Sequence, residues 1–132
     1  MEFIEKNNKK TLGNLGENIA ADYLKKNGYV ILERNFKFSR FGEIDIIAKH
    51  NEYICFVEVK TRTGSNFGVP SEAVDKRKQA KIRRLAQIYI KGKGLIEYDI
   101  RFDVIEILVA YKEYGKQEYE IKDINLIENA FC

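Results

Sequence analysis

Near the start of the chain, apolar residues recur at the spacing of one face of a helix. They are Leu12, Leu15, Ile19, Tyr23 and Leu24. Gly28 follows them and is a typical stop signal for a helix. The pattern therefore predicts a first helix over about Thr11–Asn27, preceded by a flexible N-terminal segment of residues 1–10.

Three β-rich stretches follow this predicted helix. Tyr29–Asn35 predicts a short strand, and Gly42–Lys49 and Tyr53–Thr63 are longer runs rich in β-branched and aromatic residues. Because only a few residues separate the two longer runs, we expect them to form a hairpin with its turn centred on Asn51–Glu52.

In the second half of the chain the spacing of apolar residues becomes helical again before two further strands. A glycine-containing loop, Gly64–Pro70, leads to a second helix that begins at about Ser71 or Asp75 and ends near Ile90. Glycines at positions 92 and 94 are its stop signals. Its expected apolar face consists of Ile82, Leu85, Ala86 and Tyr89.

Two further strands complete the predicted fold. Tyr98–Tyr111 is a clear strand pattern, and Glu118–Leu126 alternates more weakly. The resulting order is α-β-β-β-α-β-β, which is an α/β layered domain. The 132 residues are enough for one domain, and no repeat, low-complexity segment or linker divides them. We therefore expect a single domain over residues 1–132.

Composition narrows the class of protein and the kinds of chemistry it can perform. Hydrophobic residues make up 45% and charged residues 33%, as in an ordinary globular protein. No apolar run approaches the ~18 residues of a membrane span, and no signal peptide is recognisable, so we expect a cytoplasmic protein without membrane contact. Cys55 and Cys132 form no disulfide framework, and His50 is the single histidine. Carboxylates and lysines must therefore carry any chemistry.

Positive charge is concentrated in one element. The net charge of +3 is too small to indicate a nucleic-acid partner by itself. From Lys76 to Lys93, however, there are eight basic residues and no acidic one. Such an element can bind phosphates, and it can equally be a solvated helix face.

Four charged residues are expected to meet in the predicted hairpin. Glu58, Lys60 and Arg62 are two positions apart and so project from one face of their strand. A turn at Asn51–Glu52 pairs residues whose numbers sum to 103, which sets Asp45 directly opposite Glu58. Opposed side chains in a sheet have Cβ atoms ~4.5–5.5 Å apart.

Two opposed carboxylates destabilise a sheet unless something compensates their charge. A divalent cation such as Mg²⁺ would do so, because it binds carboxylates, water and phosphate oxygens. With a lysine alongside, this grouping suits phosphodiester hydrolysis. The alternative is a solvated charged strand, but the neighbouring apolar runs indicate central strands, where unpaired charges are rare.

Residues outside the hairpin can contribute to the same site. Glu17 in the first predicted helix either approaches the two carboxylates or lies exposed. Lys78 falls on the apolar stripe of the second helix, where it either snorkels to solvent or reaches the site. Arg101 and Asp103 alternate in the fourth predicted strand, so they either pair with each other or line the cleft.

Several motifs occur in an order that resembles the bacterial YraN family, which is similar to archaeal Holliday-junction resolvases and other PD-(D/E)XK nucleases. They are GENIAADYL, GYVILERN, GEIDIIA, FVEVKTR, an FG-P stretch ahead of the basic helix, and RFDVI. The resemblance covers nearly the whole chain, from Gly16 through Asp103.

This resemblance implies a restriction-endonuclease-like core, with α-β-β-β-α-β order and a mixed central sheet flanked by helices. It implies a site dependent on Mg²⁺ or Mn²⁺, with Asp45, Glu58 and Lys60 as the metal-and-lysine motif and Glu17 as a further carboxylate from the helix. The motif's nominal proline is replaced by Ile44, which affects no ligand.

The sequence therefore predicts an endonuclease acting on DNA, with branched or structured DNA as the favoured form. Asp45, Glu58 and Glu17 are the predicted metal ligands, and Lys60 positions the nucleophile. The residues expected to contact phosphates are Arg62, Lys76, Arg77, Lys78, Lys81 and Arg84. Two alternatives stay open: a nucleic-acid-binding module without catalysis, and an interaction protein whose basic helix docks on an acidic partner. A monomer and a homodimer are both compatible with the sequence.

Overall fold

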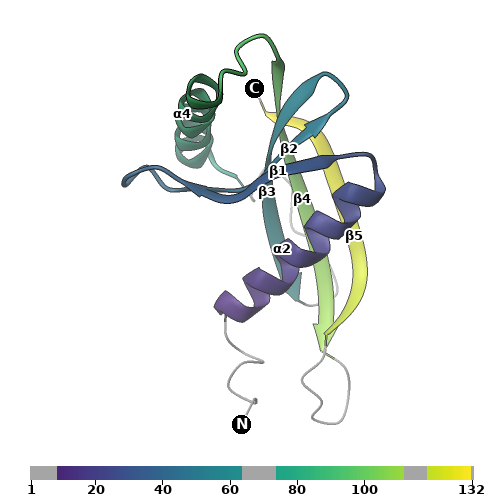
Figure 1. The fold of residues 1–132 in the computed structure, drawn as a ribbon. Coiled ribbons are helices and arrows are strands. Elements are labelled where there is room, and N and C mark those ends of the chain that lie inside the picture. Colours follow the sequence, from purple (N-terminus) through teal and green to yellow (C-terminus); the bar gives the residue numbers. More distant parts are fainter. Residues whose placement is uncertain (1–8, 64–73, 112–118, 132) are drawn as a thin grey trace.

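In the computed structural model, residues 9–63, 74–111 and 119–131 are described (Figure 1). The predicted order of elements is confirmed: α2 (Lys9–Lys26), β1 (Val30–Lys37), β2 (Glu43–His50), β3 (Tyr53–Thr63), α4 (Lys76–Lys93), β4 (Asp99–Tyr111) and β5 (Tyr119–Phe131).

The largest differences from prediction lie at the ends of elements. The first helix begins at Lys9, inside the N-terminal segment that we expected to be flexible, and the last strand continues to Phe131 instead of stopping near Leu126. The rest of that N-terminal segment and the predicted loop Gly64–Pro70 lie outside the described residues. Helix and strand ends depend on caps and tertiary contacts more than on periodicity, and they are the least predictable feature of an element.

The strands form one mixed sheet with the order β1-β2-β3-β4-β5. Only the β3–β4 pair is parallel, and the chain passes through α4 between these two strands. The hairpin register is the predicted one, since Ile46 lies opposite Val57 and His50 opposite Tyr53. Asn51 adopts the left-handed conformation that a tight turn requires, with φ of 57°. β2 and β3 therefore have a neighbour on each side and are central strands, as predicted.

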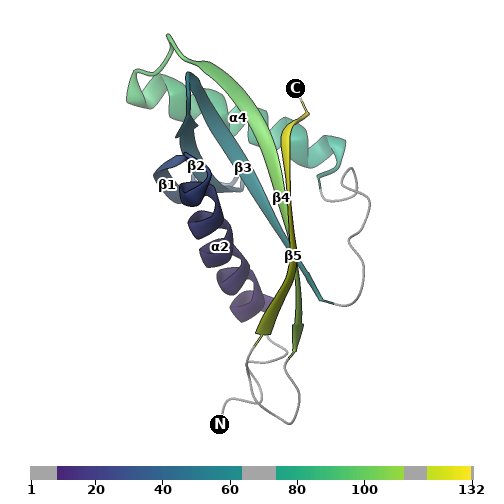
Figure 2. The same ribbon diagram turned by 90° about the vertical axis from the view of Figure 1, so that its right-hand side faces the viewer.

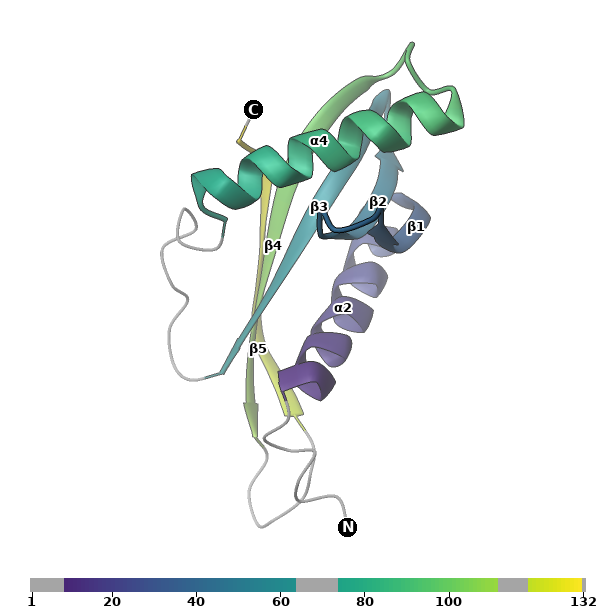
Figure 3. The same cartoon turned by 90° about the vertical axis from the view of Figure 1, so that its left-hand side faces the viewer.

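The two helices cover opposite faces of the sheet (Figures 2 and 3). β3 divides its side chains between them, because successive residues of a strand point to opposite faces. Ile54 and Phe56 pack against the apolar face of α4, whereas Cys55 and Val57 pack against α2. Cys55 is a buried free thiol, and burial raises its pKa to about 12.

Local signals position α4 on its face. Asp75 is its N-cap and accepts a hydrogen bond of 2.9 Å from the backbone N–H of Lys78. This supports the later of the two predicted helix starts. Gly94 ends the helix with a φ of 65°, a conformation that glycine adopts without steric cost. Among the described residues, no helix combines the length and the apolar character needed to cross a membrane.

Candidate functional site

The site begins where β2 and β3 separate. Their backbone pairing extends from His50–Tyr53 to Ile46–Val57. Beyond that point side chains take over, since the Asp45 carboxylate accepts the N–H of Val59 at 2.8 Å and the Asp45 N–H lies 3.5 Å from the Glu58 carboxylate. The predicted register therefore places these two acids side by side at the point where the two strands part.

A break in the side-chain alternation of β2 accompanies this separation. Ile46 and Ala48 pack on the α2 side of the sheet, whereas Ile44 and Ile47 both pack on the α4 side. Strict alternation would send Ile44 to the same face as Ile46. Asp45 lies at this irregularity, between the layers of the two helices.

Three carboxylates converge at this position. Glu17 of α2 and Glu43 and Asp45 of β2 each offer an oxygen atom that lies within 4.8 Å of the others, and all three residues are half-buried. We call this group the acid cluster. The Asn35 side-chain amide donates hydrogen bonds to Glu17 at 2.9 Å and to Glu43 at 3.2 Å. Asn35 can reach both acids from β1, where it adopts a left-handed conformation with φ of 55°.

Glycine in α2 allows Glu17 to reach the acid cluster. A Cβ atom on Gly16 would lie 1.7 Å from the Oγ1 atom of Thr61 in β3, far closer than any van der Waals contact. The missing side chain therefore lets α2 approach β3 closely. Glu17 follows directly in the chain, so this close packing holds its carboxylate next to Asp45.

Glu58 is the most buried acid of the site, with 3% of its side chain exposed. The Lys78 ammonium of α4 lies 3.1 Å from its carboxylate. Burial and the nearby charge of Asp45 raise the pKa of Glu58 to about 8, although Lys78 opposes the rise. Burial and the charges of Glu17 and Glu43 raise the pKa of Asp45 to about 6, against the Val59 N–H and Lys78. Without a further cation, the two acids resist carrying negative charge together at neutral pH.

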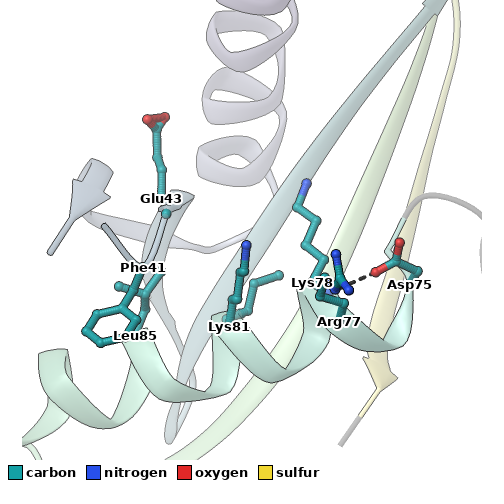
Figure 4. Close-up of a pocket in the computed structure, with 9 residues that line it drawn as sticks. Phe41, Glu43, Asp75, Arg77, Lys78, Lys81 and Leu85 are labelled. Carbon is teal, nitrogen blue, oxygen red and sulfur yellow. Dashed lines mark hydrogen bonds between the residues drawn. The ribbon is translucent and has the colours of Figure 1, made fainter. Parts of the chain in front are cut away.

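Two neighbouring hollows give access to these groups. A cavity of about 510 Å³ is lined from both helices and from β2 and β3 by Leu12, Gly13, Glu17, Asp45, Val59, Lys60, Thr61 and Lys78. A groove of about 320 Å³ between α4 and the start of β2 is lined by Phe41, Gly42, Glu43, Asp75, Arg77, Lys78, Lys81, Ile82 and Leu85 (Figure 4). Lys78 lines both hollows, so they meet at its side chain.

Most of the predicted site residues are brought together. One cavity is lined by Asp45, Lys60 and Lys78, and Glu58 lies next to Asp45 at its border. Glu17 approaches the carboxylates, which was one of the two positions predicted for it. Lys78 reaches the site instead of merely extending to solvent, because it pairs with Glu58. Burial disfavours its charge, but Glu58 outweighs this effect and raises the pKa of Lys78.

Arg62 has a partner that the sequence pattern did not indicate. Its Nε donates to the carboxylate of Glu106 in β4 at 3.2 Å, and Glu106 is fully buried. The other Glu106 oxygen, Oε1, lacks a hydrogen-bond partner among the described residues. Contact of Arg62 with a phosphate stays a prediction, and it would have to share this guanidinium with Glu106.

Glu43 and Asn35 are the functional residues that sequence reasoning missed. Glu43 precedes Asp45 by two positions, so strand periodicity places both on one side, and this signal could have identified it. Nothing in the local sequence distinguishes Asn35, because its role depends on a left-handed kink in β1. The converging group is therefore Glu17, Glu43 and Asp45, whereas the predicted ligand Glu58 is paired with Lys78.

The donor set of the acid cluster fits a hard divalent cation. Carboxylate oxygens are the protein ligands that Mg²⁺ and Mn²⁺ favour. Three carboxylates within 4.8 Å also repel one another, and a cation among them would offset that repulsion. Asp103 provides a contrast, because it pairs with Arg101 at 2.9 Å and is not part of the cavity lining.

Comparisons with known proteins agree with one another. Residues 16–107 match the family described as "Uncharacterised protein family UPF0102". A UPF0102 protein of Acetivibrio thermocellus is 51% identical over 126 residues, covering 96% of this chain and 95% of that protein. One from Caldanaerobacter subterraneus subsp. tengcongensis is 51% identical over 128 residues, covering 97% of this chain and all of the relative. One from Clostridium acetobutylicum is 50% identical over 122 residues, covering 92% and 94%. The chain therefore belongs to the UPF0102 family, the YraN-type family that its motifs resemble.

Proposed function

We propose that this protein is a metal-dependent endonuclease that hydrolyses phosphodiester bonds in DNA, with branched or otherwise structured DNA as its preferred form. The observation that carries the proposal is the acid cluster, whose carboxylates lie within 4.8 Å of one another beside a cavity that Lys60 and Lys78 also line. The resemblance of the motifs to Holliday-junction resolvases and other PD-(D/E)XK nucleases supports the same chemistry.

Each side chain has a role in this proposal. Asp45, Glu17 and Glu43 would hold the cation, and Glu58, whose carboxylate lies 3.5 Å from the backbone nitrogen of Asp45, would add a further negative charge beside them. A bound divalent cation supplies charge neutralisation at the phosphate and lowers the pKa of a water molecule. Lys60 orients that nucleophile or stabilises the negative charge that develops on the phosphate oxygens. Lys78 pairs with the buried Glu58 and favours its charged form, and it presents an ammonium to the cavity.

Basic side chains on α4 continue this charge outward. Arg77 and Lys81 line the groove next to the cavity, and Lys76 and Arg84 lie on the same helix. They attract the phosphate backbone without reading its sequence, because a phosphate contact carries no base information. Selection of a structured form must then come from the shape of the DNA that fits around the site.

One observation favours a second candidate, a nucleic-acid-binding module without catalysis. Glu58 is paired with Lys78 at 3.1 Å, so part of the negative charge is offset without any metal. In that case the carboxylates would be idle and the α4 surface would account for binding. The two candidates differ in one property that can be measured directly, which is metal-dependent cleavage.

The test is a cleavage screen over junctions, flaps, nicked and linear DNA with Mg²⁺ or Mn²⁺, together with the variant Lys60→Ala. We expect cleavage by the native protein and a fall in kcat of about a hundredfold or more in the variant, because Lys60 acts mainly in the transition state. Substrate affinity should change little, since one ammonium among many contributes a small share of the phosphate attraction.

The matched control is Lys49→Ala. Lys49 is a half-buried lysine of β2 whose ammonium lies 5.3 Å from the centre of the Tyr98 ring, away from the acid cluster. The Lys49→Ala variant should leave kcat unchanged. If no DNA form is cut and calorimetry detects no metal binding, the endonuclease proposal fails and the binding module replaces it. Equal kcat values for native protein and Lys60→Ala would remove Lys60 from the mechanism.

A further inference from the structure

The turn between β1 and β2 carries two phenylalanines close to the acid cluster. The chain reverses at Phe38–Phe41, where the Phe41 N–H donates to the Phe38 carbonyl at 3.2 Å. Ser39 and Gly42 adopt left-handed φ values of 54° and 110°, which sharpen the turn. The connection reaches out beyond the sheet on the side where α4 lies (Figure 1). Its last aromatic residue, Phe41, is two positions from Glu43 of the acid cluster.

The two rings are arranged as an exposed aromatic stack. Their planes differ by 7°, with the ring centroids 6.4 Å apart. Phe41 is anchored, because it packs against the α4 cluster and the Arg84 guanidinium lies 4.4 Å from its ring centre. Phe38 is 47% exposed, so part of a large apolar ring faces solvent. Phe41 thus packs beside the Phe38 ring, about half of which stays exposed to solvent.

The groove beside this stack has an apolar floor and a cationic rim. Ile82 and Leu85 are buried at its base. Arg77, Lys78 and Lys81 stand around it, and in Figure 4 Lys78, Lys81 and Glu43 extend away from α4 toward the same side. Its acids are already engaged, since Asp75 caps α4 and Glu43 belongs to the acid cluster. The groove therefore offers its positive charge to an anion and its aromatic rings to a flat apolar group.

We propose that the Phe38–Phe41 turn and this groove bind an unpaired strand of nucleic acid beside the acid cluster, with a base stacked on Phe38 and phosphates held by Arg77 and Lys81. This inference rests on the proposed nuclease function and specifies its substrate further. A base within a duplex is stacked on both faces and cannot cover an aromatic ring, whereas an unpaired base has an open face. Cations alone would suit any polyanion, and the exposed ring is the feature that favours a base.

The absence of tryptophan from the chain makes the contact directly observable. The variant Phe38→Trp contains a single tryptophan at the proposed stacking position, and stacking on a base quenches indole fluorescence. The matched reporter is Ile121→Trp, which replaces another exposed apolar residue in β5 at the opposite edge of the sheet. Both are titrated in EDTA, so that no cleavage occurs, with oligothymidylate, with a relaxed circular DNA duplex that has no ends or unpaired bases, and with polyglutamate.

We expect oligothymidylate to quench Phe38→Trp strongly and Ile121→Trp weakly, and the circular duplex to quench neither to the same extent. In a label-free binding assay, Phe38→Ala should lower the affinity for oligothymidylate about tenfold, which is within the range of one lost stacking contact. Ile121→Ala should leave that affinity unchanged.

Three results would overturn the inference: no quenching of Phe38→Trp, equal quenching by the circular duplex, or equal quenching by polyglutamate. Equal quenching by polyglutamate would show a surface that binds polyanions in general, including acidic proteins. Because these measurements are made without metal, they are independent of the cleavage screen. A protein that cuts DNA but shows no quenching would keep the nuclease function and lose the stacking site, and an inactive protein that shows quenching would do the reverse.

Discussion

Buried acids belong to two side-chain groups of the sheet, one that reaches the His50 end of β2 and one at its Glu43 end, and the two groups treat them in opposite ways. In the group that reaches His50, the fully buried Asp103 of β4 receives four hydrogen bonds of 3.0 Å or less, from two Arg101 nitrogens, the Tyr29 hydroxyl and the Asn129 N–H. His50 completes the group, stacked on Tyr29 with the ring centroids 4.1 Å apart. The charge of Asp103 is compensated by these groups of the chain itself.

The Tyr29–Arg101–Asp103 group is accordingly built to keep its charges. Burial and the charge of Asp103 raise the pKa of the Tyr29 hydroxyl, so it stays a donor. Burial disfavours the charge of Arg101, but the hydrogen bonds and charge of Asp103 outweigh this effect and raise its pKa. A buried pair of this kind is stable only while both partners are present.

The other end of β2 has more acids and fewer donors. Asp45 and Glu58 share one lysine and two backbone N–H groups, and Glu17 and Glu43 add further negative charge to Asp45. Burial, together with this lack of compensation, raises the pKa of Asp45 to about 6 and that of Glu58 to about 8. The comparison indicates that satisfied buried charges hold the fold together, whereas under-compensated ones next to a cavity are available to bind a cation.

Exchanging one acid at each end tests the comparison with the largest expected effects. Asp45→Asn should weaken Mn²⁺ binding about a hundredfold or more and abolish cleavage, with little loss of stability, because it removes an under-compensated charge. Asp103→Asn should lower the free energy of unfolding by about 3–5 kcal/mol, because Arg101 loses its buried partner. Calorimetric metal titration and urea denaturation measure the two effects. An Asp45→Asn protein that binds Mn²⁺ normally would break the comparison.

The pH dependence of stability gives the next largest effect. The pKa of Glu58 rises from an ordinary 4.5 to about 8 on folding, so the folded state binds a proton that the unfolded chain releases. The contribution of this group is therefore present below about pH 4.5 and is lost as the pH rises to about 8. In urea denaturation without metal, stability should fall less with rising pH in Glu58→Gln than in the native protein, by at most a few kcal/mol. Added Mn²⁺ should stabilise the native protein most at pH 8.

The control for this measurement is Glu52→Gln, in the exposed hairpin turn. It should leave the dependence of stability on pH as it is in the native protein. Identical pH profiles for the native protein and Glu58→Gln would show that Glu58 ionises normally in the fold, and the distinction between the two ends of β2 would lose its electrostatic basis.

Two glycines of α2 offer a smaller and sharper test of how the acid cluster is assembled. Gly16→Ala places a Cβ atom against Thr61, so it should destabilise the fold by about 1–3 kcal/mol and weaken Mn²⁺ binding by displacing Glu17. Gly13→Ala meets nothing within 4 Å and should stabilise the protein by about 0.5–1 kcal/mol through helix propensity. If Gly16→Ala is neutral for both stability and metal binding, α2 does not position Glu17 by this contact.

The smallest expected effect concerns surface charge at the two ends. Arg77 and Lys81 line the groove near the acid cluster, whereas Lys25 and Lys26 end α2 close to the Tyr29 end of the sheet. Replacing Arg77 and Lys81 by alanine should flatten the dependence of log K on log[salt] for duplex DNA by about 0.9 per lost phosphate contact. Replacing Lys25 and Lys26 should leave that slope unchanged. Equal slopes for both double variants would remove α4 from the binding surface.

Much of the fold was predictable because its signals are local. Element order followed from the change between helical and strand periods, and the hairpin register followed from a short turn at Asn51. The pairing of Arg101 with Asp103 was one of two alternatives, and choosing between them required knowing that Tyr29 and Asn129 join them from distant parts of the chain. Periodicity carries no information about such long-range partners.

By itself the sequence determined the elements, the central position of β2 and β3, and the placement of Asp45 beside Glu58, since each depends on residues close together in the chain. Only the tertiary structure decided which further groups meet them. Glu17 arrives because Gly16 lets α2 pack closely on β3, Glu43 joins through the kinked Asn35, and Lys78 reaches Glu58 from the opposite helix layer. These contacts arise from the docking of preformed elements, which is governed by shape and burial across the whole molecule. Strand periodicity can indicate Glu43, but it does not say which groups from other elements arrive.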